Sequence, residues 1–235
     1  MKNKVVQIED LGKKDYKSTW DQQEDIFQQI LDIKVSNRRE DKNQKTPNYL
    51  LFVEHPHVYT LGKSGDINNL KINDAKLKEV DATYYKINRG GDITYHGPGQ
   101  IVAYPILDLE NFFTDIHKYL RLLEESVIKT LAEFNIKGER SKGETGVWID
   151  VGTPYARKIC AMGVRASRWV TMHGLAFNIN TDLQYFDYII PCGIQDKAVT
   201  SLNKEVGKEK LEVEPIKNSL TQHFLELFEA EKKIS

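Results

Sequence analysis

At its densest point the chain reads Arg89-Gly-Gly-Asp-Ile-Thr-Tyr-His-Gly-Pro-Gly-Gln100-Ile-Val-Ala-Tyr-Pro-Ile-Leu107. Four of the first twelve residues are glycine, which permits positive φ angles and lets a ligand approach the backbone closely. Arginine, threonine, tyrosine and histidine lie among these glycines, and a very apolar run follows. A surface turn needs none of that chemistry, so the stretch predicts a binding loop that leads into a buried strand.

This loop is not a phosphate-binding loop of the usual kind. The Gly-x-x-x-x-Gly-Lys-Ser/Thr pattern is absent, and Gly97-Pro98-Gly99 lacks the spacing of the dinucleotide fingerprint. We therefore expect no nucleotide and no other cofactor.

Short apolar segments on both sides of the loop predict strands that mostly follow one another. They are Tyr49–Val53, His57–Leu61, Thr83–Ile87, Ile101–Leu107, Gly146–Asp150, Lys158–Val164 and Trp169–Ile179. With only a few helices beside them, these strands predict an α+β fold with mixed or antiparallel sheets rather than a doubly wound parallel sheet.

Apolar residues at helical spacing predict three helices. The first carries its apolar face from Tyr16 to Leu31, the second runs from Ile116 to Phe134, and the third opens near Pro215 and reaches Leu227. Thr114 is the expected cap of the second helix and Gly138 its expected end.

The length of 235 residues suits a single catalytic domain, 1–235, with a core at about 49–202. The polar run Ser36–Asn48 predicts an exposed loop. Val206–Glu214, mostly lysine and glutamate, is expected to link a carboxy-terminal helical appendage at about 214–232.

Composition narrows the class of partner and the compartment. A net charge of −1 supplies no general field for nucleic acid or an anionic membrane, and no run approaches the roughly 20 apolar residues of a membrane span. Charge appears in the first residues before any signal-peptide core, and two cysteines make no disulfide framework. We expect a cytoplasmic monomer that binds neither nucleic acid nor membrane.

Two short segments carry the raw material of covalent acyl transfer. Cys192 stands in Ile190-Pro-Cys-Gly-Ile194, and Lys158 stands upstream in Arg157-Lys-Ile-Cys-Ala-Met-Gly163. A free cysteine with a pKa of about 8.5 is mostly protonated at neutral pH, and a nearby ammonium lowers that pKa. If the two groups meet, Cys192 becomes a competent nucleophile.

Other chemistry-bearing residues have simpler interpretations. Cys160, among apolar neighbours, is predicted to be buried packing. His55 and His57 have no third ligand at sensible spacing, so we expect no zinc and no other metal. His96 and His173 lie beside glycine, and the residues alone leave structural and catalytic roles equally open.

Five motifs in this order resemble the lipoyl(octanoyl) transferases, octanoyl-[acyl-carrier-protein]:protein N-octanoyltransferases of the biotin/lipoate protein ligase superfamily. They are the loop quoted above, the segment from Lys158 to Arg165, His173-Gly-Leu-Ala-Phe-Asn178, Pro191-Cys192-Gly193 and Thr200-Ser-Leu202. The resemblance runs from about Tyr49 to Leu202 and implies a biotin/lipoate protein ligase-like fold.

The resemblance also implies a two-step reaction. Cys192 would take the octanoyl group from octanoyl-acyl carrier protein as a thioester, with Lys158 as its catalytic partner. A lysine on a lipoyl domain of a 2-oxo-acid dehydrogenase complex or of the glycine-cleavage H protein would then receive it. His173 is implied as a further pocket residue, and the family's substrate-binding positions correspond to Arg89, Gly90, Gly91, Asp92, Ile93, Thr94, Tyr95, His96, Ala161, Met162, Gly163, Gly174, Leu175 and Ala176.

Three alternatives stay open at the level of the residues. An ATP-dependent lipoate–protein ligase shares the implied fold but needs no nucleophilic cysteine, which the Pro-Cys-Gly segment disfavours. A catalytically silent module that docks carrier or lipoyl domains would need neither Cys192 nor Lys158. A cysteine thioesterase differs in its final acceptor, which is water in place of an amine.

Overall fold

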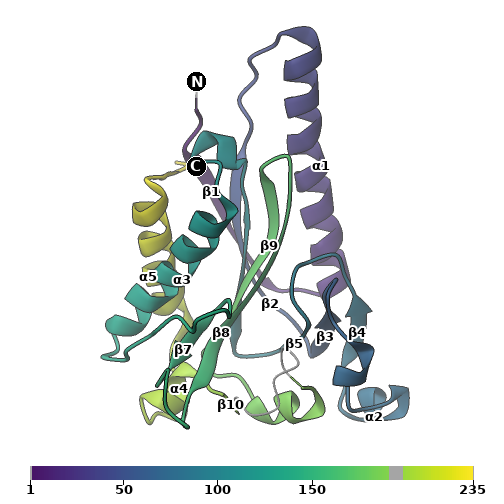
Figure 1. Ribbon diagram of the computed structural model, residues 1–235, viewed down its shortest axis with the longest axis vertical. Coiled ribbons are helices and arrows are strands. Elements are labelled where there is room, and N and C mark those ends of the chain that lie inside the picture. The colour runs from purple at the N-terminus through teal and green to yellow at the C-terminus, as the bar shows by residue number, and fades with distance from the viewer. Residues whose placement is uncertain (1, 191–197, 235) are drawn as a thin grey trace.

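The computed structural model describes residues 2–190 and 198–234, and their main feature is a large mixed sheet (Figure 1). Its strands follow the order β10-β8-β9-β6-β2-β1-β11, and β7 pairs with β8 beside this path. The β2–β6, β6–β9 and β8–β9 pairs are antiparallel, whereas β1 pairs with both its neighbours in parallel. The strand bounds are β1 Val5–Lys13, β2 Asn48–Glu54, β6 Gln100–Ile106, β7 Val147–Ile149, β8 Arg157–Ser167, β9 Val170–Asn178, β10 Ala198–Val199 and β11 Glu231–Lys232.

A second, smaller sheet has the order β4-β3-β5, with β3 at Val58–Leu61, β4 at Thr83–Lys86 and β5 at Ile93–His96. Strand β5 lies inside the stretch predicted to be a loop, so that prediction is wrong for its centre. Ile93 and Tyr95 are buried while Thr94 between them is partly exposed, which is the period-2 pattern of a half-buried strand. Helix α2 (Asp74–Glu79) and the 3₁₀ helices η1 (Ile67–Asn69) and η3 (Leu183–Tyr188) complete this part.

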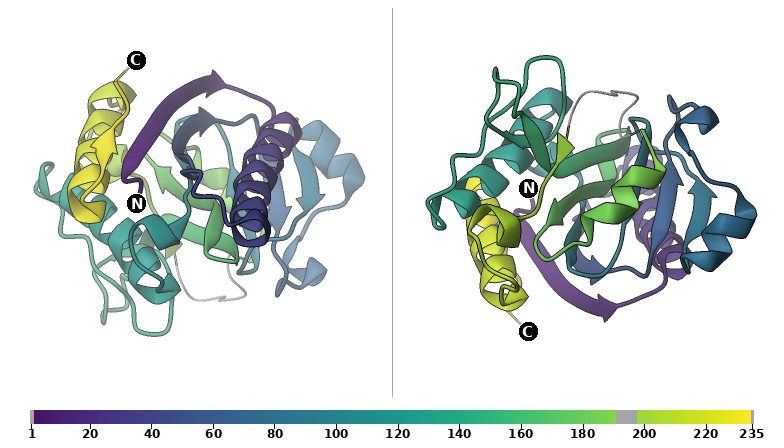
Figure 2. Two further views of the ribbon diagram at one scale, coloured as in Figure 1. Left: turned by 90° about the horizontal axis from the view of Figure 1, so that it is seen from above. Right: turned by 90° about the horizontal axis from the view of Figure 1, so that it is seen from below.

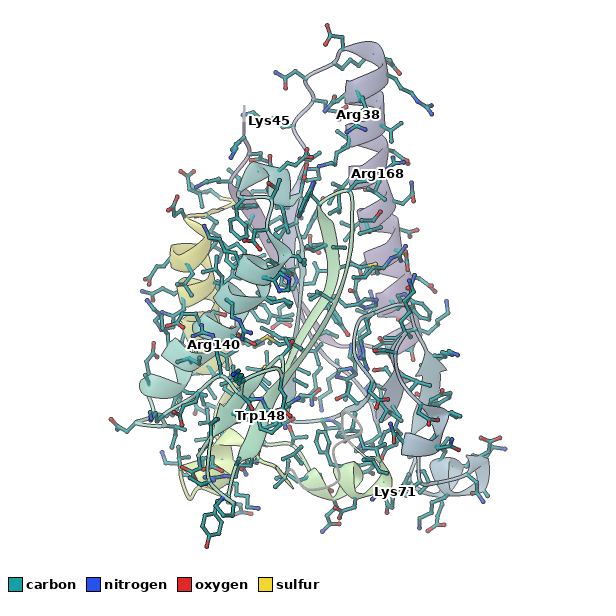
Figure 3. All side chains as sticks on the ribbon, in the orientation of Figure 1. Arg38, Lys45, Lys71, Arg140, Trp148 and Arg168 are labelled. Carbon is teal, nitrogen blue, oxygen red and sulfur yellow. The ribbon has the colours of Figure 1, made fainter. Side chains whose placement is uncertain are left out.

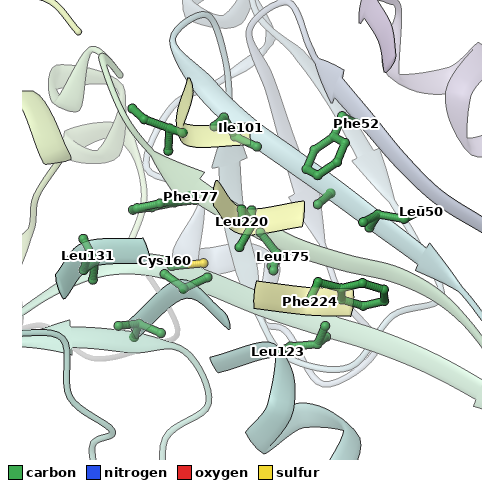
Figure 4. Packing of buried hydrophobic residues seen from close by; sticks show 14 of the residues in the cluster. Leu50, Phe52, Ile101, Leu123, Leu131, Cys160, Leu175, Phe177, Leu220 and Phe224 are labelled. Carbon is green, nitrogen blue, oxygen red and sulfur yellow. The ribbon is translucent and has the colours of Figure 1, made fainter. Parts of the chain in front are cut away.

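Helices cover both faces of the large sheet. Helix α1 (Tyr16–Glu40) lies on one face together with the small sheet, and α3 (Ile116–Ala132) and α5 (Val213–Phe228) lie on the other (Figure 2). The main core fills the space between the sheet and the α3–α5 pair, where Phe177 and Leu175 meet Leu220 and Phe224 (Figure 4). The short helices α4 (Leu202–Glu205) and η2 (Leu109–Asn111) lie in connections. The predicted α+β class with mixed sheets is confirmed.

The predicted exposed loop Ser36–Asn48 is wrong at both ends. Helix α1 continues to Glu40, and Asn48 already belongs to β2. Thr46 and Asn48 are buried because both bond to the segment after β6: Thr46 Oγ1 donates to Asp108 Oδ2 at 2.8 Å, and Asn48 Oδ1 accepts from the Asp108 N–H at 3.1 Å. These hydrogen bonds offset the cost of burying the two polar side chains.

The ends of two predicted helices shift. Asp115, rather than Thr114, caps α3, because its side chain accepts from the Lys118 N–H. That helix ends at Ala132, before Gly138. Helix α5 begins at Val213, and its apolar face belongs to the main core, while β11 after it pairs with β1.

Candidate active site

A cavity of about 550 Å³ opens beside the central strands β8 and β9, beneath the loop that precedes β5. Most residues predicted to bind substrate line it: Arg89, Gly90, Gly91, Asp92, Ile93, Thr94, His96, Lys158, Ala161, Met162, Gly163, His173, Gly174, Leu175 and Ala176. The structure thus brings together segments that are far apart in the sequence. Their roles in substrate binding stay predictions.

Two predicted residues are not in this lining. The Tyr95 ring is fully buried in the core of the small sheet, and its hydroxyl lies 2.7 Å from His57 Nδ1. Cys192 lies outside the described residues, which stop at Ile190 and resume at Ala198.

The lining also includes residues that were not among the predicted site residues: Tyr16, Ser64, Val102, Tyr104, Leu120, Gly143, Glu144, Thr145 and Val164. Tyr16 belongs to the apolar face of α1 and Tyr104 to an apolar strand, so local patterns assign both to the core. Only the crossing of α1 over the large sheet shows that they face the cavity.

The glycine loop is fastened directly to β8. The Gly90 N–H donates to the Val164 carbonyl at 2.9 Å, and a Cβ on Gly163 would lie 2.8 Å from the Gly90 carbonyl oxygen. The buried Arg89 guanidinium donates from Nη2 to the Thr60 carbonyl at 2.7 Å, which ties the loop to β3. A glycine is therefore needed at position 163 because two backbones meet there.

Asp92 fastens the glycine loop through three hydrogen bonds. Its Oδ1 accepts from the Ile93 N–H at 2.7 Å and the Asp66 N–H at 3.2 Å, and its Oδ2 accepts from Asn69 Nδ2 at 2.5 Å. The Asn69 carbonyl in turn accepts from the Ile190 N–H at 2.8 Å. These bonds connect the loop to the last described residue before the Pro-Cys-Gly motif.

Lys158 is held from both neighbouring strands. It pairs with Trp148 of β7 and with Val199 of β10, and its carbonyl accepts from the Thr200 N–H at 2.9 Å. Its side chain is buried, and its Nζ lies 4.6 Å from the centroid of the Trp148 ring, which Figure 3 labels. An aromatic face attracts an ammonium group, so the ring helps to fix its position.

A buried carboxylate anchors the loop that forms one wall near Lys158. Glu124 of α3 accepts from the Gly146 N–H at 3.0 Å through Oε1, and from Arg121 and Arg140 through Oε2. Because both arginines neutralise it, Glu124 stays buried without an unpaired charge. Gly143, Glu144 and Thr145, just before Gly146, line the cavity.

Two buried histidines face the same cavity. His96 Nδ1 lies 2.9 Å from Gln100 Oε1, and burial, reinforced by His55, lowers the His96 pKa to about 3. His173 has a φ of +59°, which is rare for a side chain other than glycine. Burial, then the Arg89 charge, lowers the His173 pKa to about 3. Both rings are therefore neutral at pH 7.

These two histidines make folding sensitive to acid. An unfolded histidine binds a proton below about pH 6.5, whereas His96 and His173 in the folded chain do so only near pH 3. The contribution of each neutral histidine to the free energy of unfolding is therefore fully present above pH 6.5. It falls by about 2 kcal/mol per histidine by pH 5 and decreases further toward pH 3. Urea unfolding at pH 7.5 and pH 5 measures this loss. The loss of unfolding free energy between these two pH values should be smaller in His96→Asn than in the wild type. An equal loss in the two proteins would contradict the low pKa of His96.

The second cysteine is structural, as predicted. Cys160 is fully buried in the main core, and burial raises the pKa of its thiol (Figure 4). Within residues 2–190 and 198–234, no three histidine, cysteine, aspartate or glutamate side chains are arranged to hold a metal ion. None of the helices in those residues is long and apolar enough to cross a bilayer.

Comparison with known proteins identifies the family. Residues 15–225 match the lipoyl protein ligase A/B catalytic domain. The octanoyltransferase of Flavobacterium psychrophilum is 70% identical over 227 residues, which cover 97% of this chain and 98% of that protein. The octanoyltransferase of Bacteroides thetaiotaomicron is 49% identical over 205 residues, 87% of each chain.

Solved structures share the fold at much lower identity. The bipartite lipoate protein ligase of Thermoplasma acidophilum superposes with a TM-score of 0.68 at 16% identity, covering 100% of this chain and 87% of that one. A lipoate-protein ligase A bound with ATP gives a TM-score of 0.69 at 12% identity, over 100% of this chain and 89% of its own. The full-length likeness at high sequence identity places this chain in the octanoyltransferases of the lipoyl protein ligase A/B catalytic domain family.

Proposed function

We propose that the cavity binds the octanoyl group of octanoyl-acyl carrier protein and that Cys192 accepts this group as a thioester. In the first step a bond forms between the Cys192 sulfur and the acyl carbonyl carbon, and the bond to the carrier sulfur breaks. In the second step the amine of a lipoyl-domain lysine attacks the same carbon, which gives an amide and frees the thiolate. Because one thioester replaces another, the storage step needs no ATP.

Lys158 moves the protons in this scheme. As an ammonium it stabilises the Cys192 thiolate, and it then gives a proton to the departing carrier thiolate. The neutral Lys158 amine takes a proton from the attacking lysine as the amide forms. This transfer restores the ammonium beside the free thiolate, so the cycle closes without another acid or base.

The shared lining of one cavity carries the proposal. Lys158 faces the same space as Ala161, Gly163, Gly174 and Ala176, whose small side chains suit a narrow apolar chain. Strand β10 also supports the proposed partnership of Cys192 and Lys158. This strand begins directly after residues 191–197, and its Val199 pairs with Lys158 itself.

The acceptors in this proposal are lipoyl domains of 2-oxo-acid dehydrogenase complexes and the glycine-cleavage H protein. The reaction is assigned to the cytoplasm, a reducing compartment in which an unpaired catalytic thiol persists. An amide product distinguishes transfer from the action of a thioesterase, which would release free octanoate.

Intact-protein mass spectrometry tests the covalent step. The protein is mixed with octanoyl-acyl carrier protein, and a lipoyl domain is added afterwards. We expect one octanoyl adduct on the wild type, none on Cys192→Ala, and discharge of the adduct onto the lipoyl domain. An adduct that survives Cys192→Ala, or transfer that requires ATP and free octanoate, would replace the thioester route by another mechanism.

A further inference from the structure

The cavity changes character along its length. In the β8–β9 pair Ala161 faces Ala176, Gly163 faces Gly174, and Val164 faces His173. Lys158 lies six positions before Val164 on β8, so roughly 20 Å of strand separates the two at about 3.3 Å per residue. Small side chains line the middle of this length, and His173 lies at the end remote from Lys158.

That remote end is polar. Tyr16, His96 and Arg89 line the cavity there, and the Tyr16 ring stacks on His96 with centroids 5.9 Å apart. Tyr16, Arg89, His96 and His173 all line this one cavity. The apolar channel that begins beside Lys158 thus ends in hydrogen-bonding groups.

His173, at this end, has unused hydrogen-bonding capacity. Its side chain is 2% exposed, and neither of its ring nitrogens has a hydrogen-bond partner among the described residues. Behind it, Gln23 of α1 is fully buried and accepts from the His173 N–H at 3.0 Å, which holds this residue from the helix. Buried polar atoms of this kind normally bind water or a ligand.

We propose that His173, held in place by Gln23, excludes long acyl chains from the cavity, a specificity role that rests on the octanoyl transfer proposed above. With C–C bonds near 1.5 Å, an extended octanoyl chain is about 9 Å long and a hexadecanoyl chain about 19 Å. A chain whose carbonyl lies beside Lys158 therefore ends at the level of Ala161 when it has eight carbons. A chain of about sixteen carbons reaches the level of His173.

The cost to a long chain is desolvation. A methyl group that reaches His173 covers its ring nitrogens, which have no partner in the described part of the chain, and offers no hydrogen bond in return. The octanoyl chain ends before these atoms. It is therefore buried in the apolar middle of the cavity without the cost of desolvating polar atoms. The αL backbone of His173 and its bond to Gln23 hold the ring at the end of the channel.

A competition experiment tests the proposal. Octanoyl- and hexadecanoyl-acyl carrier protein compete for one lipoyl domain, and mass spectrometry of the two amide products gives the ratio of their kcat/KM values. We expect the wild type to favour octanoyl. In His173→Leu the hexadecanoyl-to-octanoyl ratio should rise about tenfold, because the last methylenes then enter an apolar end. Gln23→Met removes the bond to the His173 N–H without needing an unusual backbone conformation, and it should raise the ratio in the same direction.

Matched variants separate this role from general damage. His173→Asn keeps a polar side chain that tolerates positive φ and should keep the wild-type ratio. Met172→Leu changes the neighbouring buried residue of β9 outside the cavity lining and should leave both the ratio and the octanoyl rate unchanged.

The proposal is overturned if the ratio stays unchanged in a folded His173→Leu protein and in Gln23→Met. A wild type that uses both chains equally overturns it as well. If His173→Leu does not fold, the result for Gln23→Met decides. Failure of the underlying function would look different, because the wild type would then transfer no octanoyl group in the same assay.

Discussion

Replacement of Lys158 by methionine should slow octanoyl transfer about a thousandfold, the range expected when a general acid–base group is removed. Methionine keeps the apolar stem over Trp148 and removes only the charge and the proton. Both acyl-enzyme formation and its discharge then become slower, because Cys192 loses its thiolate-stabilising cation and the incoming amine loses its base. Single-turnover transfer from octanoyl-acyl carrier protein to a lipoyl domain measures the effect.

Lys158→Arg separates the two roles. Arginine keeps a positive charge but does not deprotonate in proteins. The acyl-enzyme should therefore form faster in this variant than in Lys158→Met, while its discharge to the lipoyl domain stays slow. The rate of Cys192 alkylation across a pH series gives a second test, in which Lys158→Met should shift the thiol pKa upward. Cys160 does not compete for the reagent because it is fully buried. An unchanged alkylation profile would refute the dyad.

The central strands were predictable because their signals are local. Strand β9 is buried along its whole length, and burial on both sides of a sheet produces an apolar run regardless of what the strand packs against. The first half of β8 carries a similar buried run, Lys158–Cys160. Strand β1 was missed because charged residues interrupt its apolar positions. Its pairing with β2 and β11 stabilises it, and no local pattern reports a pairing with residues more than two hundred positions away.

The residues of the candidate site also divide into those with a local sequence signal and those without one. Its glycine-rich segments were predictable because close backbone contact requires glycine, as at Gly163 against the Gly90 carbonyl. Tyr95 lies in the same segment but points into the small-sheet core, since neighbouring residues of β5 face opposite sides. Gln23 was not predictable, because its contact with His173 depends on how α1 crosses β9.

Gly174→Ala should destabilise the fold by about 3 kcal/mol, near the upper end for overpacking of a closely packed site. A Cβ at this position would lie 2.1 Å from the Ala103 carbonyl oxygen and 2.6 Å from Pro105 Cδ. Both contacts belong to β6, which is held between β2 and β9 and has no room to withdraw. Urea unfolding measures the loss. Gly207→Asn is the control, because it lies where a Cβ meets nothing within 4 Å and asparagine tolerates positive φ.

Gly163→Ala, at the cross-strand partner of Gly174, should behave differently. Its Cβ would meet the Gly90 carbonyl at 2.8 Å and Arg89 Cδ at 3.1 Å, which is a milder overlap than the 2.1 Å contact at Gly174. The expected loss of stability is about 1 kcal/mol, with a larger loss of transfer activity because the glycine loop is displaced from the cavity. Equal stabilities for the two variants would show that β6 yields as easily as the loop. The difference between them therefore measures how far the sheet, rather than the loop, fixes the shape of the acyl channel.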